Sequence, residues 1–189
     1  MKDILIFFNL LFILSSTSLA QTNEVIFSHY TVDDGISQSS VSCILQDSQG
    51  YIWFGTQDGL NRFNGYSFER YYHNPLDTTS ISHGWVYSIT EDADGNIWVG
   101  TRGGLNKFDK KKGVFEQITA KPGTTNSIFS NLVYGVTYYE GQLLINTPPV
   151  LNIMNLKTRE VTQYKNTIDL EKKTSAWEKS FPVIIDKKK

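Results

Sequence analysis

The chain has 189 residues, in which 18 Lys and Arg stand against 19 Asp and Glu, so its formal net charge is −1. No stretch is basic enough to neutralise a phosphate backbone, which argues against nucleic acid contacts. The single cysteine, Cys43, cannot form an intramolecular disulfide and is expected to be a small buried apolar residue. Frequent aromatic residues, punctuated by Gly, Asn and Asp, predict β-sheet with tight turns.

Residues 1–20 predict a secretory signal peptide. Lys2 precedes an apolar run from Ile4 to Leu14, and Ser18-Leu19-Ala20 offers a small-x-small cleavage site before Gln21. The run is short for a bilayer span, which favours cleavage, with an uncleaved anchor as the alternative. The sequence therefore predicts export to the periplasm. Membrane anchoring is possible in the full-length protein.

An outer strand is expected over residues 25–30, before any complete repeat. The segment FSHYT from Phe27 to Thr31 matches three later segments, which read FERYY, FEQIT and VTQYK. A leading outer strand has no blade before it and needs a partner sheet from elsewhere. In closed propellers the two ends of the chain meet in one blade, which removes the open edges.

Two copies of one motif follow, and they align without a gap. DSQGYIWFGTQDGLNRFN starts at Asp47 and DADGNIWVGTRGGLNKFD starts at Asp92, a shift of 45 residues. This period fits a four-stranded propeller blade. The Asp and Gly of D-x-x-G are expected to close a hairpin, and the Trp to fill the space between neighbouring blades. The recurring structural positions are Asp47, Gly50, Trp53, Gly55, Asp92, Gly95, Trp98 and Gly100.

Each copy predicts four strands, and the second strand carries apolar residues on both of its faces. This pattern is typical of a sheet that lies between two other sheets. The expected strands are 41–45, 51–56, 60–63 and 68–71 in the first copy, and 86–90, 96–101, 105–108 and 115–118 in the second.

A third, degenerate copy covers residues 120–165, where Leu144 replaces the Trp and Asn146 replaces the following Gly. The expected organisation is all-β, a partial β-propeller of about three four-stranded antiparallel blades in an incomplete ring, since closure typically needs four to eight blades. The predicted units are residues 21–72 for the leading strand and blade 1, 73–119 for blade 2, 120–165 for blade 3, and 166–189 for a linker with a possible short helix over 171–181.

The two complete motifs resemble the two-component regulator propeller repeat, V-x-x-I-x-x-D-x-x-G-x-[IL]-W-[IV]-G-T-x-x-G-L. Both copies keep this pattern, with Phe54 as a mild departure, and the likeness extends over about residues 27–164. The resemblance implies the N-terminal periplasmic sensor region of a bacterial hybrid two-component histidine kinase, with further blades and the kinase outside this chain. It also implies sensing of oligosaccharides, signal transduction and a phosphorelay in the full-length relative.

No catalytic or metal site is predicted. The roles of Asp47 and Asp92 in turns account for these carboxylates without glycoside chemistry. The segment DADGN lacks the bidentate Glu of a calcium loop, because Gly103 stands at that position. The three His residues have no metal-ligand spacing, and no nucleotide-binding Gly motif or kinase His box is present. We therefore expect no enzyme activity in this chain, no cofactor and no metal.

A ligand, if one binds, is expected on the face that carries the turns between second and third strands and the connections between blades. Trp85 and His83 could stack on or hydrogen-bond a sugar ring; the alternative is that Trp85 packs between blades and His83 is solvated. The leading hypothesis is an oligosaccharide sensor, and the alternatives are an interaction scaffold, a propeller lyase or a glycosidase. A homodimer is also considered. The candidate ligand-binding residues are Gln57, Asp58, His83, Trp85 and Arg102.

Overall fold

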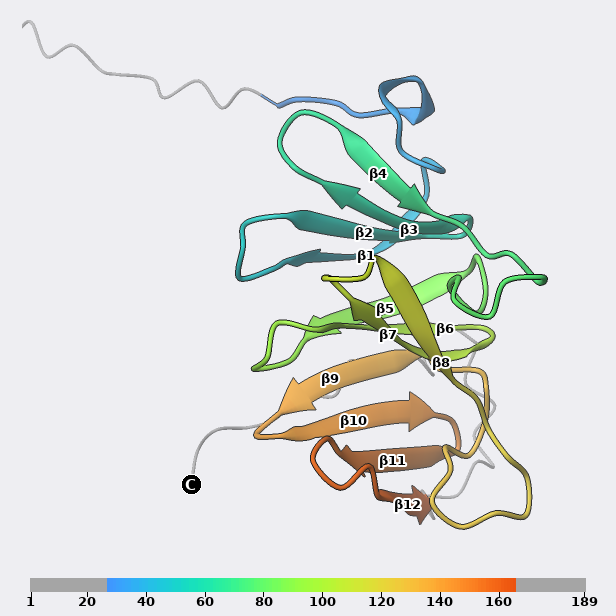
Figure 1. Cartoon of the computed structure of the whole chain (residues 1–189). Coiled ribbons are helices and arrows are strands. Elements are labelled where there is room, and N and C mark those ends of the chain that lie inside the picture. The colour runs from blue at the N-terminus through green and yellow to red at the C-terminus, as the bar shows by residue number, and fades with distance from the viewer. Residues whose placement is uncertain (1–26, 166–189) are drawn as a thin grey trace, which may run out of the picture.

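Three four-stranded antiparallel sheets follow one another along the chain and lie side by side (Figure 1). The structure, a computed structural model, describes residues 27–165. Within each sheet the strands are neighbours in sequence order, as expected of a meander closed by short turns. Sheet 1 contains β1 (Val41–Gln46), β2 (Ile52–Thr56), β3 (Gly59–Phe63) and β4 (Phe68–Tyr71).

Sheet 2 contains β5 (Val86–Glu91), β6 (Ile97–Thr101), β7 (Gly104–Asp109) and β8 (Val114–Ile118). Sheet 3 contains β9 (Gly135–Tyr139), β10 (Gln142–Thr147), β11 (Val150–Asn155) and β12 (Val161–Lys165). The expected partial propeller of three blades is confirmed, and the degenerate third copy forms a complete blade. Among the described residues, the first strands β1, β5 and β9 contact one another in that order, and the ring is not closed.

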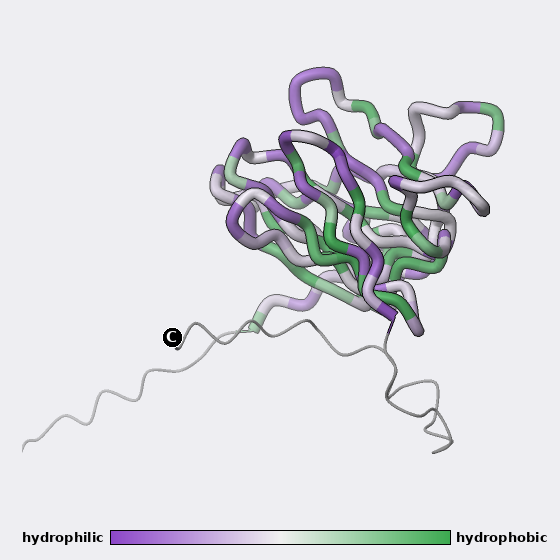
Figure 2. The backbone as a smooth tube through the Cα atoms, turned by 90° about the horizontal axis from the view of Figure 1, so that it is seen from below, coloured by the Kyte–Doolittle hydropathy of each residue, from purple (hydrophilic) through white to green (hydrophobic). Residues whose placement is uncertain are grey.

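Apolar side chains fill the two spaces between the blades. Trp53 of blade 1 packs with Ile97 and Val99 of blade 2, and Trp98 of blade 2 packs with Leu143 and Ile145 of blade 3; all these side chains are buried. Hydrophobic stretches of the backbone, drawn in green, lie mainly within the body of the molecule, and hydrophilic stretches, drawn in purple, are more frequent toward its periphery (Figure 2). The expectation that each Trp fills a junction between blades is confirmed.

β6 shows why the second strand is apolar on both faces. Every residue of β6 is buried, because blade 2 lies between blades 1 and 3. The corresponding strand of blade 1, β2, is buried on the Trp53 side and only half-buried at Ile52 and Phe54. The apolar residues on both faces of the second strand therefore correctly predict that its sheet packs against other sheets.

The predicted leading strand is not present over residues 27–30. These residues have no strand partner, and the first element is instead a single 3-10 turn, η1 (Val32–Asp34). Tyr30 packs its ring against Phe63 and Phe68, with centroids 5.0 and 5.7 Å away, so side-chain contact replaces backbone pairing. Residues 25 and 26, the predicted signal peptide and the predicted short helix lie outside the described residues. Within residues 27–165 no helix is long and apolar enough to traverse a bilayer.

Candidate ligand-binding surface

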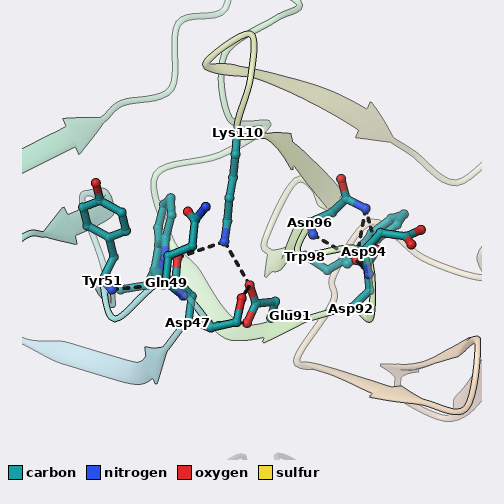
Figure 3. A network of polar contacts seen from close by, with 11 residues as sticks. Asp47, Gln49, Tyr51, Glu91, Asp92, Asp94, Asn96, Trp98 and Lys110 are labelled. Atoms are coloured by element: carbon teal, nitrogen blue, oxygen red, sulfur yellow. Dashed lines mark hydrogen bonds and ion pairs between the residues drawn. The ribbon is translucent and has the colours of Figure 1, made fainter.

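Each Asp of the D-x-x-G motif binds both its own turn and the buried Trp. The Asp92 carboxylate accepts hydrogen bonds from the backbone N–H of Asp94 (3.0 Å), that of Asn96 (2.9 Å) and Trp98 Nε1 (2.7 Å) (Figure 3). Asp47 accepts the equivalent bond from Trp53 Nε1 at 2.9 Å. Gly50 and Gly95 close these turns with φ of 88° and 80°, as the sequence predicts. The bond from Trp to Asp links the hairpin to the junction between blades.

A lysine joins blade 1 to blade 2 at the same end of the molecule. Lys110 Nζ lies 3.0 Å from Asp47 Oδ2 and 2.9 Å from Glu91 Oε1 (Figure 3). Burial by itself would raise the pKa of Asp47, but the hydrogen bonds from Trp53 and Lys110 hold it below its usual value. Burial would lower the pKa of Lys110, and its bonds to Glu91 and Asp47 raise it instead. This ion-pair network was not predicted.

The opposite ends of the strands carry the candidate ligand residues, and a buried polar group holds them in place. Ser82 donates its backbone N–H to Asn106 Oδ1 (2.8 Å) and pairs its hydroxyl with Thr101 Oγ1 (2.9 Å). Thr101 Oγ1 in turn donates to the Gly104 carbonyl at 2.9 Å. The same group recurs in blade 1 as Ser37, Thr56 and Asn61. It fastens the connection between blades to the turn between second and third strands.

As expected, the turns between second and third strands lie on the same face as the connections between blades. Arg102 N–H donates to the Trp85 carbonyl at 3.1 Å, and Gly59 N–H donates to the Gly84 carbonyl at 2.6 Å. A side chain at Gly103 would lie 2.6 Å from the Ser82 carbonyl oxygen, so the turn approaches the connection closely. Residues 82–85 therefore lie between the turns of two adjacent blades.

Three aromatic rings form a surface at this point, which we name the aromatic platform: Trp85, Tyr87 and Tyr134. The Trp85 and Tyr87 rings stack with centroids 5.8 Å apart, and Tyr87 meets Tyr134 at 5.0 Å. All three side chains are half-buried. The pairing of β5 with β6 shifts register between Val86 and Ser88, and this irregularity leaves Tyr87 unpaired in the ladder.

Cationic and imidazole groups border the platform. The exposed guanidinium of Arg102 has its Cζ 5.8 Å from the Trp85 ring centroid. His83 Nδ1 accepts the Trp85 backbone N–H at 2.9 Å, and its ring stacks on His73 at 6.1 Å. Burial, His73 and Arg102 together lower the pKa of His83, which favours the neutral imidazole at pH 7. Neutral imidazole offers one donor and one acceptor.

The structure brings three of the five predicted ligand residues together: Trp85, His83 and Arg102. The exposed residues Gln57 and Asp58 adjoin Gly84 through their backbones. Tyr87, Tyr134 and His73 were missed by the sequence reasoning. The signal for the two tyrosines was present, because V-Y recurs at the same repeat position in Val86-Tyr87 and Val133-Tyr134.

The platform is an open surface, and two hollows of the molecule lie away from it. One hollow, of about 330 Å³, lies between blades 2 and 3 and is lined by Gln117, Ser127 and Met154 among others. The other is lined by Ser48, Asn96 and Lys110 among others, beside the D-x-x-G turns. Within residues 27–165 no three His, Cys, Asp or Glu side chains cluster as metal ligands would.

The fold and the repeated Asp–Trp–turn unit define a β-propeller module. The model of the two-component regulator propeller family matches residues 35–58 and 80–103, which cover the first two strands of blades 1 and 2. Blades 1 and 2 therefore each contain a segment that matches the two-component regulator propeller repeat.

Known proteins with related sequence or structure point in the same direction. Histidine kinase P4 of Formosa agariphila is 48% identical over 83 residues, which are 43% of this chain and 6% of the kinase. The extracellular domain of a protein described as a hybrid two-component system from B. thetaiotaomicron superposes with a TM-score of 0.68 at 27% identity. That match covers 73% of this chain and 20% of the other, so the present chain spans a small part of both relatives.

Virginiamycin B lyase from Staphylococcus aureus shares the blade architecture only. Its TM-score is 0.53 at 17% identity, with 71% of this chain and 44% of the lyase covered. A shared propeller fold carries many unrelated functions, so this likeness concerns the fold alone.

Proposed function

We propose that this chain is a periplasmic sensor segment that binds an oligosaccharide on the aromatic platform and signals through a kinase outside the chain. The observation that carries the proposal is the cluster of Trp85, Tyr87 and Tyr134 rings on one face, which Arg102 and His83 border. Half-buried aromatic rings give a rigid apolar surface for a sugar ring at low entropic cost. Arg102 and His83 supply the polar contacts that orient hydroxyl or carboxylate groups.

The likeness to sensor kinases supports the signalling half of the proposal. One relative is named a histidine kinase, and another is the extracellular domain of a hybrid two-component system. In a longer protein of that kind, the remaining blades and the kinase domains would be the partners of this segment. A periplasmic location agrees with the extracellular position of that relative's domain and with the predicted signal peptide.

Titration calorimetry with a panel of neutral and acidic oligosaccharides of two to six sugar units tests the proposal. We expect at least one member of the panel to bind. The Trp85→Ala variant should then lose about 30-fold in affinity, the effect typical of a central aromatic contact worth about 2 kcal/mol. Arg102→Ala should weaken binding as well.

Tyr66→Ala is the matched control. Tyr66 is 96% exposed and lies in the turn between β3 and β4, away from the platform. Its affinity for the same oligosaccharide should equal that of the parent chain, and thermal unfolding should show that all variants are folded. Unchanged affinity in both Trp85→Ala and Arg102→Ala would reject the assigned surface. No binding across the panel would favour an interaction scaffold instead.

A further inference from the structure

Arg102 brings an unpaired positive charge to the aromatic platform. Its guanidinium is exposed, with Cζ 5.8 Å from the Trp85 ring centroid. Arg62 and Arg159 each form an ion pair with a glutamate, whereas Arg102 forms none with any acid of residues 27–165. The backbone of Arg102 is fixed nonetheless, because its N–H donates to the Trp85 carbonyl. The charge is therefore held beside the ring without being neutralised.

This charge is confined to one of the three equivalent turns. The residue after the second strand is Gln57 in blade 1, Arg102 in blade 2 and Pro148 in blade 3. The acid of the neighbouring turn, Asp58, forms no ion pair within the described chain, and residues 82–85 lie between its turn and that of Arg102. A ligand that crosses the platform therefore meets a single cation, which suits one anionic group.

The other polar groups of the platform are neutral and offer hydrogen-bond donors. His83 Nδ1 accepts the Trp85 backbone N–H at 2.9 Å, so the neutral imidazole carries its proton on Nε2, where it can donate. Burial and the neighbouring Tyr134 raise the pKa of Tyr87, so its phenol remains protonated at pH 7. The guanidinium of Arg102 has donors only. Donors together with one fixed positive charge favour an oxyanion over a neutral hydroxyl group.

We propose that the aromatic platform selects an oligosaccharide that carries an anionic group, a carboxylate or a sulfate ester, which Arg102 binds while a sugar ring stacks on Trp85. A guanidinium can lie against an aromatic ring and still present its fork of N–H donors to an oxyanion. The inference rests on the proposed function, to which it adds the chemical class of the ligand.

Titration calorimetry with matched pairs of ligands tests this selection. Tetrasaccharides of galacturonate, of mannuronate and of a sulfated galactan are each compared with a neutral form, made by reducing the carboxylates to hydroxymethyl groups or by removing the sulfates. We expect an anionic ligand to bind about 10-fold or more tightly than its neutral form, as a hydrogen bond to a charged group would provide. The uronate and sulfate arms show which anionic group is recognised.

The outcomes separate the inference from the proposed function. Neutral forms that bind as tightly as their anionic partners, and that lose affinity in Trp85→Ala, would overturn the anionic class and leave the proposed function standing. No binding by any of these ligands would count against both.

Arg102→Gln assigns the selection to one side chain. Glutamine already occupies the equivalent position of blade 1, as Gln57, so the turn accommodates it. The anionic ligand should bind this variant about 10-fold more weakly, at the affinity of its neutral form, whereas the affinity of the neutral form should not change. Arg102→Lys should retain part of the selection, because an ammonium keeps the charge but loses the fork of donors.

Lys111→Gln is the matched control, since it also removes one positive charge. Lys111 is exposed in the turn between β7 and β8, beside the D-x-x-G turns at the opposite ends of the strands. This variant should bind both ligands of a pair like the parent chain, and thermal unfolding checks that every variant is folded. A preference for the anionic form that persists in Arg102→Gln would overturn the assignment to Arg102.

Discussion

A single carboxylate organises each complete repeat. Asp92 is buried, and it satisfies two backbone donors of its turn together with the indole N–H of Trp98. An indole that fills a junction between sheets still needs a partner for its N–H. The Asp supplies that partner and holds the turn that returns the chain into the Trp strand. The repeat therefore couples hairpin geometry to packing between blades through one side chain.

Removing this carboxylate should destabilise blade 2 strongly. Asp92→Ala leaves the Trp98 Nε1 donor buried without its partner and frees the turn N–H groups. Because an orphaned buried polar group costs about 1–3 kcal/mol and the turn is lost in addition, we expect a loss of about 2–4 kcal/mol. Urea unfolding followed by Trp fluorescence measures it. Asp94→Ala, an exposed neighbour in the same turn, should change stability by less than about 0.5 kcal/mol. Equal effects of the two substitutions would contradict this role for Asp92.

Lys110 should stabilise the fold in a defined pH window. The pKa of Asp47 is lower in the folded chain than in the unfolded chain, where it is about 3.9. The ionised carboxylate therefore stabilises the fold at pH values above the unfolded pKa, and this stabilisation is lost as the pH falls through the folded pKa. The pKa of Lys110 is higher in the folded chain than in the unfolded chain, where it is about 10.4. The protonated amine therefore stabilises the fold at pH values below the unfolded pKa, and this stabilisation is lost as the pH rises through the folded pKa. The side chain of Lys110 is 15% exposed, so Lys110→Met should cost about 1–3 kcal/mol near pH 7.

The measurement is the difference in unfolding free energy between the parent and Lys110→Met across roughly pH 2.5–11, a range that extends beyond the ordinary pKa values of Asp and Lys at either end. This difference should be largest at neutral pH and shrink toward both extremes. Lys111→Met is the control, since Lys111 is exposed and its only bond in this region is from its backbone N–H to Asp109. A difference that is independent of pH would show that Lys110 acts through packing alone.

At the scale of the element, the G-T of the motif sets how closely two blades approach. A side chain built at Gly100 would lie 2.9 Å from Val133 Cγ1 and 3.0 Å from its carbonyl oxygen. At Gly55 the Cβ would lie 2.6 Å from Val86 Cγ1 of blade 2, and 2.4 Å from Cys43 Sγ on the paired strand of blade 1. Cys43 itself is half-buried against the junction of blades 1 and 2, and burial raises the pKa of its thiol to about 11. Gly55 and Gly100 are therefore required because the next blade places a valine, Val86 or Val133, against each of them.

Gly100→Ala should push blade 3 away from blade 2. Overpacking of this kind costs about 1–3 kcal/mol, and we expect a corresponding fall in the urea midpoint. Gly135→Ala is the matched control in a strand of the same junction. Its Cβ would meet nothing nearer than Asn146 Cβ at 3.5 Å, an ordinary contact. A Gly100→Ala variant as stable as Gly135→Ala would mean that the junction is more tolerant than its geometry indicates.

The blades could be predicted from the sequence because the patterns for strands, turns and apolar faces are local and occur in two copies of the repeat. β2, β6 and the turns at Gly50 and Gly95 agree with expectation for that reason. The leading strand was wrong over residues 27–30, since a matching sequence cannot pair without an adjacent edge. Lys110 and Tyr134 were missed because their partners lie one blade away, 63 residues for Lys110 to Asp47. Whether the predicted ligand residues bind a ligand stays a prediction.

At the scale of the whole molecule, blade 2 lies between blades 1 and 3 of the incomplete ring, and the main contacts between blades within residues 27–165 join neighbouring blades. β1 contacts β5 and β5 contacts β9, and the two apolar clusters are separate. Stability in such an arrangement is approximately a sum of blade terms and junction terms. A weakened junction should therefore release the terminal blade before the rest unfolds.

Val133→Ala tests this at the junction between blades 2 and 3. Val133 is fully buried there, and the loss of two methyl groups predicts a cost of about 2 kcal/mol. Native-state hydrogen exchange should show faster exchange in β9–β12, with β1–β4 unchanged, because the junction of blades 1 and 2 is untouched. Val41→Ala changes the equivalent residue of blade 1, which is 37% exposed, and should leave exchange in blade 3 at the parent rate. If Val133→Ala instead speeds hydrogen exchange equally in all twelve strands of the described residues, the three blades unfold as a single cooperative unit. In that case the junctions hold the blades together more tightly than each blade holds its own strands.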